Sequence, residues 1–170
     1  MPTGPPRSLA GTWHVDPGMS HARFTARTLA GLVKVPGRFC TLAGTISLDE
    51  RGTSGTLVID AASVDTGNRL RDRHLRSSDF FAAEAHPELR YQVDSLAHDG
   101  ERLSIDGELV IAGGRTRLPL TTELRHHDDG VIELACRTQV DRCALGVSGA
   151  RGMVPRAVDL DIALRLRRAG

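Results

Sequence analysis

The last segment of the chain alternates between apolar and polar residues, and this pattern constrains the fold more than any other feature. In the stretch VDLDIALRLRR every second residue is apolar: Val158, Leu160, Ile162, Leu164 and Leu166. Successive side chains of a β-strand point to opposite faces, so the pattern predicts a strand with one apolar and one hydrated face. The same alternation recurs in residues 21–27, 103–111 and 132–140. Strands of parallel α/β sheets are apolar on both faces, so these half-polar strands predict an antiparallel all-β protein.

Turn-forming residues separate the predicted strands. They lie at 49–55, 98–102, 112–116 and 126–130, a spacing typical of consecutive hairpins. We expect about eight strands, and an up-and-down sheet of that size tends to close into a barrel because closure removes its unpaired edges.

The chain length suits one domain. We place a single barrel domain at residues 11–168, because 170 residues are enough to bury one core and too few for two typical domains. The first ten residues contain prolines at positions 2, 5 and 6 and predict a loose arm over residues 1–10.

The alternation stops between residues 67 and 88. In NRLRDRHL, charged residues surround Leu70 and Leu75 with helical spacing, and Ser77 or Ser78 is placed to cap a second short helix. Pro87 ends the segment. The sequence therefore predicts a short helical crossover near residues 67–82, in a connection long enough to be functional or to cover something.

The composition argues against several classes of function. The formal net charge is +1, so we expect no broad basic face for nucleic acid or an anionic membrane. No apolar run is long enough for a membrane span or a signal peptide, so we expect a cytoplasmic protein without stable membrane insertion. The cysteines Cys40, Cys136 and Cys143 form no CxxC pair, and the seven histidines show no HxH or HExxH spacing. Neither a disulfide framework nor a metal site is predicted.

The stretch SVDTGNRLRDRHLRSSDFFAAEAHPELRY, residues 63–91, carries a specific motif. It contains Ser-x-x-Thr, Arg-Asp-x-His-Leu, a serine, Asp-Phe-Phe and His-Pro before an aromatic strand, and it resembles the signature of the YceI-like family of bacterial polyisoprenoid-binding proteins. Further stretches similar to that family are TWHVDPGMSHARFTAR (12–27), VPGRFCTLAGTISLD (35–49), IDGELVIAGGRTRLPL (105–120) and VDRCALGV (140–147). The chain departs from the family at Met19, where a histidine is usual, and in lacking the signal peptide that many members carry.

The resemblance implies a set of structural signature residues, among which the only tryptophan is expected to plug the closed end of the barrel. They are Trp13, Asp16, Ser20, Ser63, Thr66, Asp72, His74, Ser77, Asp79 and Pro87.

The resemblance also implies a fold and a ligand. The fold is a lipocalin-like, eight-stranded antiparallel barrel whose elongated apolar pocket holds a polyisoprenoid or an isoprenoid-tailed quinone, with no other cofactor. The candidate ligand contacts are Phe24, Phe39, Leu57, Ile59, Leu75, Phe80, Phe81, Tyr91, Ile105, Leu109 and Leu134. An eight-stranded barrel is wide enough either to fill with side chains or to hold one small ligand. Small inward residues favour the cavity, and a barrel packed shut by leucine and valine stays open as the alternative.

The segment RDRHLRSSDFF admits two interpretations. Its arginines Arg71, Arg73 and Arg76 are headgroup candidates, because a guanidinium suits a diphosphate; otherwise the charged residues brace the crossover. Phe80 and Phe81 are expected to divide, one facing the barrel mouth and the other packing outside the sheet.

Three functions stay open. The first is a non-enzymatic carrier or sequestering protein for a long apolar small molecule, with a homodimer possible. The second is an enzyme acting on such a ligand with His74 as general base, although no GxSxG elbow is present. The third is a solid-barrel stress-response interaction module.

Overall fold

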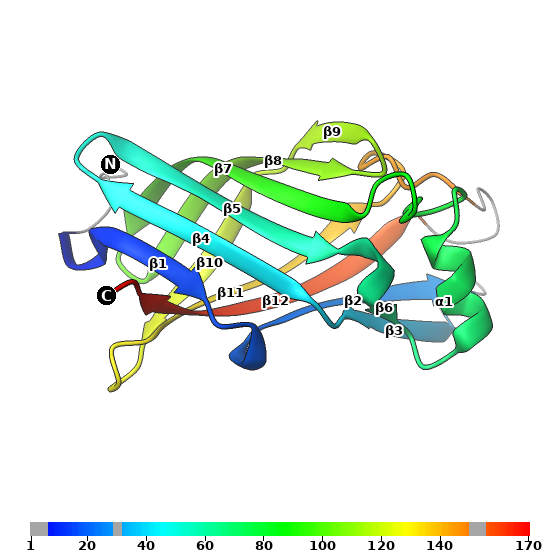
Figure 1. The fold of residues 1–170 in the computed structure, drawn as a ribbon, viewed down its shortest axis with the longest axis horizontal. Coiled ribbons are helices and arrows are strands. Elements are labelled where there is room, and N and C mark those ends of the chain that lie inside the picture. The colour runs from blue at the N-terminus through cyan, green and yellow to red at the C-terminus, as the bar shows by residue number, and fades with distance from the viewer. Residues whose placement is uncertain (1–6, 29–31, 150–155) are drawn as a thin grey trace.

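The structure is a computed structural model that describes residues 7–28, 32–149 and 156–170. Eight antiparallel strands close into a barrel in the order β1-β4-β5-β7-β8-β10-β11-β12, with β12 pairing back to β1 (Figure 1). Their bounds are β1 (Gly11–Val15), β4 (Leu42–Asp49), β5 (Gly52–Asp60), β7 (Glu88–Asp99), β8 (Arg102–Ile111), β10 (Leu120–His126), β11 (Ile132–Asp141) and β12 (Ala157–Arg168). The predicted eight-stranded antiparallel barrel is confirmed.

Further strands extend this barrel. They are β2 (His21–Thr28), β3 (Val33–Phe39), β6 (Val64–Asp65) and β9 (Gly114–Arg117). Strand β12 is long enough to pair twice along one edge, with β2 through residues 158–163 and with β1 through residues 166–168. The hairpin of β2 and β3 therefore continues the sheet at one end of the barrel, while β1 closes the other.

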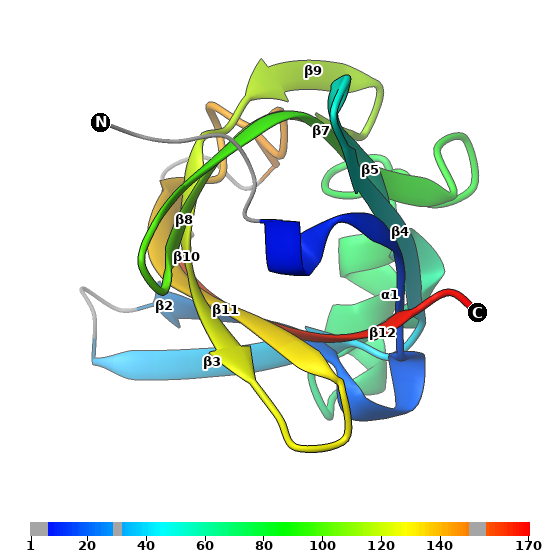
Figure 2. The same ribbon diagram turned by 90° about the vertical axis from the view of Figure 1, so that its left-hand side faces the viewer.

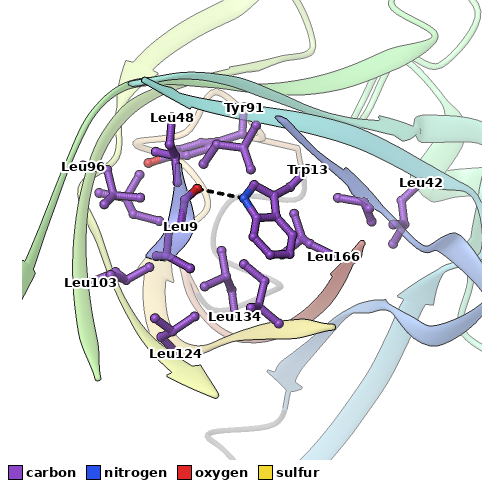
Figure 3. Close-up of a cluster of buried hydrophobic side chains, with 14 of the residues drawn as sticks. Leu9, Trp13, Leu42, Leu48, Tyr91, Leu96, Leu103, Leu124, Leu134 and Leu166 are labelled. Carbon is purple, nitrogen blue, oxygen red and sulfur yellow. Dashed lines mark hydrogen bonds between the residues drawn. The ribbon is translucent and has the colours of Figure 1, made fainter. Parts of the chain in front are cut away.

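The N-terminal residues seal one end of the barrel. The short 3-10 helix η1 (Arg7–Leu9) lies across that end in Figure 2, and Leu9 and Trp13 are buried among the leucines labelled in Figure 3. The indole N–H of Trp13 donates to Leu9 O at 2.9 Å, and the Arg168 guanidinium lies 4.5 Å above the indole ring. We call Leu9, Trp13 and the leucines around them the plug; these leucines are Leu42, Leu48, Leu96, Leu103, Leu124, Leu134 and Leu166.

The expected loose arm over residues 1–10 is wrong for its last four residues. Residues 7–10 are held in place because Leu9 fills the end of the core and Arg168 donates hydrogen bonds to Ser8 O and Ala10 O. Residues 1–6 lie outside the described part of the chain.

The crossover lies at the opposite end and contains α1 (Arg69–Arg76), the one α-helix among the described residues. Asn68 caps its start by accepting from Arg71 N at 3.0 Å. The predicted short helical crossover is confirmed, but the second helix is wrong. Phe81 N donates to Leu75 O and Ala83 N to Arg76 O, so the chain turns back to satisfy the last carbonyls of α1. Ser77 ends α1 instead of starting a helix.

Two further 3-10 helices, η2 (Pro17–Met19) and η3 (Ala61–Ser63), mark bends in the chain. Helix η2 separates β1 from β2, and η3 leads β5 away from the barrel wall toward β6 and α1. Both bends lie where the chain passes from the closed barrel to the crossover end.

Candidate ligand-binding cavity

The inward face of β12 shows where the interior of the barrel is not filled by side chains. Val158 and Leu166 at the two ends of this row are buried, whereas Leu160, Ile162 and Leu164 between them keep part of their surface exposed although they point inward. Their exposed surface faces a cavity of about 270 Å³. The volume approaches the size of ordinary small-molecule pockets, about 300–1,000 Å³.

All eleven candidate ligand contacts border this cavity. Its wall comes from the inward rows of the barrel strands, and Leu75 of α1 with Phe80 and Phe81 borders the end opposite the plug. We call that end the mouth. The predicted residues along the cavity are Phe24, Phe39, Leu57, Ile59, Leu75, Phe80, Phe81, Tyr91, Ile105, Leu109 and Leu134.

Aromatic rings gather at the mouth. The ring centroids of Phe24 and Phe39 lie 5.7 Å apart, and those of Phe39 and Phe81 lie 5.4 Å apart in an edge-on arrangement. Phe80 also borders the cavity and is buried. The expectation that one of the two adjacent phenylalanines packs outside the sheet is therefore wrong. The turn after α1 directs both rings to the interior, because its N–H groups bond back to the end of the helix.

Polar groups inside the cavity are few. The Tyr91 hydroxyl donates to Leu118 O at 2.7 Å, and burial raises the pKa of Tyr91 to about 12. The hydroxyl of Thr122 is buried without a hydrogen-bond partner. Thr122 of β10 pairs with Leu103 of β8, which belongs to the plug, and Leu124 is the next residue of β10 that points inward. The Thr122 hydroxyl therefore lies toward the closed end of the cavity. The chemistry available to a bound molecule is therefore apolar contact, with isolated hydrogen-bonding groups.

Arg142 also borders the cavity, a position that the sequence pattern does not predict. It is 6% exposed, its guanidinium lies 5.7 Å from the Phe80 ring centroid, and Nη1 donates to Val147 O and Gly149 O at 2.9 and 2.7 Å. The side chain holds the loop after β11 against the mouth. The sequence contains this arginine in the Asp-Arg pair of VDRCALGV, a stretch similar to the family. The strand pattern gives no indication that the Arg142 side chain is buried.

The three predicted headgroup arginines lie elsewhere. Arg71 donates to Thr66 Oγ1 at 2.8 Å and to Thr66 O at 3.0 Å. Arg76 donates to Ala62 O and Val64 O at 2.8 and 3.2 Å, and Arg73 is exposed. None of these three described residues borders the cavity. The structure brings Arg71 and Arg76 to the crossover backbone, because the turn through residues 62–66 presents carbonyl groups to α1.

Comparison with known proteins places the chain in a family. The profile of the YceI-like domain matches residues 13–166. The chain belongs to the YceI-like family. Protein YceI of Escherichia coli O157:H7 is 31% identical over 122 residues, which are 69% of this chain and 63% of that protein. The UPF0312 protein plu2095 of Photorhabdus laumondii is 31% identical over 121 residues and is covered to the same 63%. The match thus spans less than two thirds of these relatives.

Solved structures share the fold at low sequence identity. Burkholderia cenocepacia BcnA aligns with a TM-score of 0.79 at 19% identity, over 89% of this chain and 98% of that one. A polyisoprenoid binding domain from Saccharophagus degradans, implicated in plant cell wall breakdown, aligns with a TM-score of 0.78 at 17% identity, over 92% and 98%. The Campylobacter jejuni YCEI protein has a TM-score of 0.70 at 24% identity, over 82% and 88%. The YceI-like barrel is therefore the fold of this chain.

The YceI-like signature residues of the crossover have structural contacts. Asp72 is buried and accepts hydrogen bonds from Thr66 N at 2.9 Å and from Thr66 Oγ1 at 2.6 Å. Ser63 Oγ donates to Asp60 O and accepts from Thr41 N. The contact of Asp72 joins α1 to the residue after β6, and those of Ser63 join η3 to the end of β5 and to the residue before β4, so the motif fixes the crossover that forms the mouth.

The signature residues near β1 and β7 also tie chain segments together. Ser20 Oγ donates to Asp16 O and accepts from Arg165 N. A hydrogen bond from Arg167 to Asp16 lowers the pKa of that carboxyl. Pro87 O accepts from Ala61 N. Asp16 and Ser20 therefore hold the bend at η2 against β12, and Pro87 holds the bend at η3.

His74 is exposed and faces away from the cavity wall. Its Nε2 lies 3.2 Å from Asp79 Oδ2, Ser77 Oγ donates to its carbonyl, and its ring packs edge-on against Phe80 at 5.0 Å. His74 is not among the described residues that border the cavity. The geometry therefore gives His74 no path to a molecule in the interior except through the Phe80 ring.

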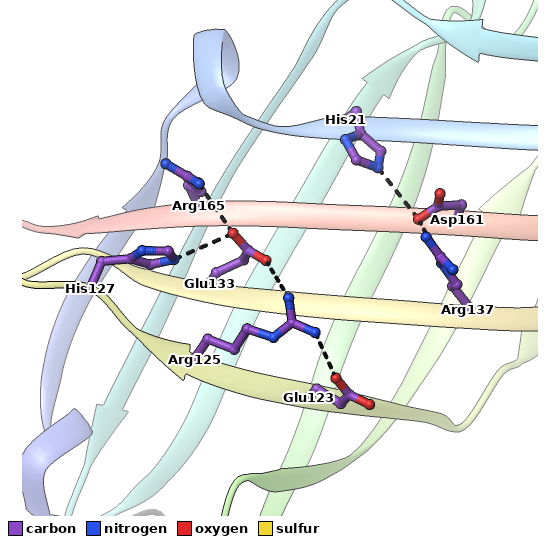
Figure 4. A network of polar contacts seen from close by, with 8 residues as sticks. All are labelled: His21, Glu123, Arg125, His127, Glu133, Arg137, Asp161 and Arg165. Atoms are coloured by element: carbon purple, nitrogen blue, oxygen red, sulfur yellow. Dashed lines mark hydrogen bonds and ion pairs between the residues drawn. The ribbon is translucent and has the colours of Figure 1, made fainter.

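A polar network covers the outer face of β10, β11 and β12 (Figure 4). Glu133 at its centre is half-buried and lies 3.2 Å from Arg165, 3.4 Å from His127 and 3.6 Å from Arg125. Outward residues of adjacent strands stand side by side, so these pairs are typical cross-strand contacts. The network lies on the side of the sheet opposite the cavity.

Within residues 7–28, 32–149 and 156–170, no three or more His, Cys, Asp and Glu side chains come together as a metal-binding group. In that part of the chain, no helix has the length and apolar character needed to cross a bilayer.

Proposed function

We propose that this chain binds one elongated apolar molecule of isoprenoid type, a polyisoprenoid or an isoprenoid-tailed quinone, and carries or sequesters it without catalysis. The observation that carries the proposal is the cavity of about 270 Å³, bordered by apolar inward rows and sealed at one end by the plug. The polyisoprenoid binding domain from Saccharophagus degradans, which has the same fold, supports the choice of ligand class.

Apolar burial is sufficient for binding in such a cavity. Each buried CH₂ group contributes about 0.8 kcal/mol, so one isoprene unit contributes about 4 kcal/mol. Association costs about 4–15 kcal/mol in lost translational and rotational freedom. Burial of three units, about 12 kcal/mol, therefore covers most of this range and burial of four covers all of it without a charged anchor, in accord with the small number of polar groups along the wall.

The alternatives receive less support. An enzyme acting through His74 requires this side chain to reach the ligand, and His74 pairs with Asp79 outside the cavity wall. The solid-barrel module requires a filled interior, which disagrees with the inward residues of β12 that keep exposed surface.

The test is uptake of an isoprenoid quinone, followed by its absorbance as it co-elutes with the protein in gel filtration. Leu109→Trp fills the cavity from β8, and Val110→Trp adds the same ring at the next residue, on the outer face. We expect one quinone per chain in the wild type and in Val110→Trp, and at least tenfold weaker uptake in Leu109→Trp. Equal uptake by the two variants, or none by the wild type, contradicts the proposal.

A further inference from the structure

Exposed apolar side chains of the barrel concentrate at the mouth. Among the described residues, four large apolar side chains are exposed: Met19, Leu32, Val33 and Leu70. Leu32 and Val33 lie where β3 begins, and Leu70 lies in α1. Leu32 is 86% and Leu70 is 73% exposed. Single exposed leucines are ordinary, but a group of them around the opening of an apolar cavity marks an interaction surface.

The two apolar sites flank the mouth. Figure 1 places the end of β2, the start of β3 and α1 at the end of the barrel opposite η1. Figure 2, which looks along the barrel, shows the β2–β3 hairpin and α1 on different sides of the axis. A flat surface pressed against this end therefore meets Leu32 and Val33 on one side and Leu70 on the other.

Positive charge accompanies each apolar site. Lys34 follows Val33, and Arg69 and Arg73 lie one and three residues from Leu70 on the exposed face of α1. None of these three cations forms an ion pair with a described residue, although the neighbouring Arg27 and Arg38 do. Arg69 and Arg73 are four residues apart, so they repel each other and destabilise the helix slightly. An anionic surface would offset that repulsion.

The opposing charge at the mouth is small. Among the described residues of 64–88, Asp65 and Glu88 pair with Arg38 and Arg90, Asp79 lies beside His74, and Glu84 is the one exposed carboxylate with no ion-pair contact. Counted over β3 and residues 64–90 together, seven Lys and Arg side chains face five Asp and Glu side chains, so the balance around the opening is positive. A net charge of +1 for the whole chain conceals this local excess.

We propose that the mouth docks reversibly on the surface of an anionic lipid bilayer. Leu32, Val33 and Leu70 enter the headgroup region, where apolar side chains are favourable, and Lys34, Arg69 and Arg73 face the anionic headgroups. The inference rests on the proposed function, because docking brings the opening of the cavity against the source of an apolar ligand. The ligand then passes between bilayer and barrel without crossing water.

The test is flotation of the full chain with vesicles of phosphatidylglycerol mixed with phosphatidylcholine, and with vesicles of phosphatidylcholine alone. We expect binding to the anionic vesicles, weaker binding to the neutral ones, and a loss on addition of salt, because salt screens surface charge. The triple variant Lys34→Gln, Arg69→Gln, Arg73→Gln lowers partitioning about a hundredfold, since each cation contributes about fivefold. The double variant Leu32→Ser, Leu70→Ser lowers it at least about tenfold.

Matched controls carry the same chemical changes away from the mouth. Met19→Ser removes an exposed apolar side chain in η2, and Arg51→Gln removes an exposed cation from the turn between β4 and β5, at the plug end (Figure 1). Both keep wild-type partitioning. The docking proposal is overturned if the wild type does not float with anionic vesicles at low salt, or if the controls weaken binding as much as the mouth variants.

A second measurement separates docking from ligand binding and from self-association. Quinone uptake from solution stays at the wild-type level in the mouth variants, because none of the substituted residues borders the cavity. A wild type that floats through its mouth residues but takes up no quinone refutes the proposed function and leaves docking intact. A dimer in ultracentrifugation that dissociates in the Leu32→Ser, Leu70→Ser variant, with flotation unchanged, assigns this surface to a second copy of the chain and refutes docking.

Discussion

Substitution of Trp13 by alanine tests whether the plug is a packed part of the barrel. The Trp13 side chain is 3% exposed, and Leu9 and Leu166 beside it are also buried. Its indole N–H satisfies Leu9 O, and Arg168 lies over the ring. Trp13→Ala therefore removes core volume, one hydrogen bond and one cation–π contact together.

The expected loss follows from these contacts. A buried tryptophan or phenylalanine replaced by alanine costs about 3–5 kcal/mol, and this range already covers part of the hydrogen bond, itself worth about 1 kcal/mol. The contact with the exposed Arg168 adds about 0.5–1 kcal/mol. We expect Trp13→Ala to lose about 4–5 kcal/mol of unfolding free energy. For a chain of this size the loss lowers the melting temperature by about 8–20 °C.

The assay is urea unfolding followed by far-ultraviolet circular dichroism. Trp13→Phe keeps a ring in the plug and lacks the N–H donor, so it loses about 1–2 kcal/mol. Met19→Ala, at a half-exposed side chain, changes the free energy by less than about 0.5 kcal/mol. If Trp13→Ala costs no more than Met19→Ala, the plug is not packed and does not close this end of the barrel.

Three further predictions concern the crossover, the interior hydroxyl and one inward glycine. Asp72→Ala leaves two hydrogen-bond donors of Thr66 without their acceptor, so we expect a loss of about 2–3 kcal/mol of unfolding free energy in urea. Asp72→Asn keeps an acceptor and loses less. Equal losses in the two variants would argue against the role of Asp72 as the acceptor for Thr66. Tyr91 is the only tyrosine, so phenolate absorbance reports it alone: the midpoint lies near pH 12 in the folded chain and near about 10 in urea. The folded pKa lies above the unfolded pKa, so unfolding free energy falls as pH rises through this window, and a folded midpoint near 10 would contradict burial. A Cβ on Gly107 would lie 2.5 Å from Tyr91 Cζ and 2.6 Å from Gln92 O. We therefore expect Gly107→Ala to lose about 1–3 kcal/mol of unfolding free energy. A neutral effect would show that the Tyr91 ring is free to move.

The barrel and its cavity wall were predictable because side-chain direction along a strand depends only on the parity of the position. The alternation in β8, β11 and β12 identifies Ile105, Leu109 and Leu134 as inward residues, and the structure places all three along the cavity. The crossover was located by the position at which this alternation stops, and the family motif lies in the same segment.

The remaining features depend on contacts between segments far apart in the sequence. Arg71 and Arg76 bind backbone carbonyl groups of residues 62–66. No sequence pattern marks such carbonyl groups, so the two arginines were predicted as headgroup candidates instead. Arg142 is buried by the loop that follows it. Residues 7–10 were predicted as part of a loose arm because prolines precede them. The single leucine in this segment, Leu9, fills the end of the barrel, and one apolar residue forms no recognisable pattern.

Identification of the molecule bound by the protein tests the central claim most directly. The protein is purified without detergent, extracted with organic solvent, and the extract is analysed by mass spectrometry with the protein concentration known. The account predicts one isoprenoid-type molecule per chain in the wild type and in Val110→Trp, and its loss from Leu109→Trp. A wild-type extract without any apolar molecule, from protein that also takes up no added polyisoprenoid or quinone, contradicts the claim.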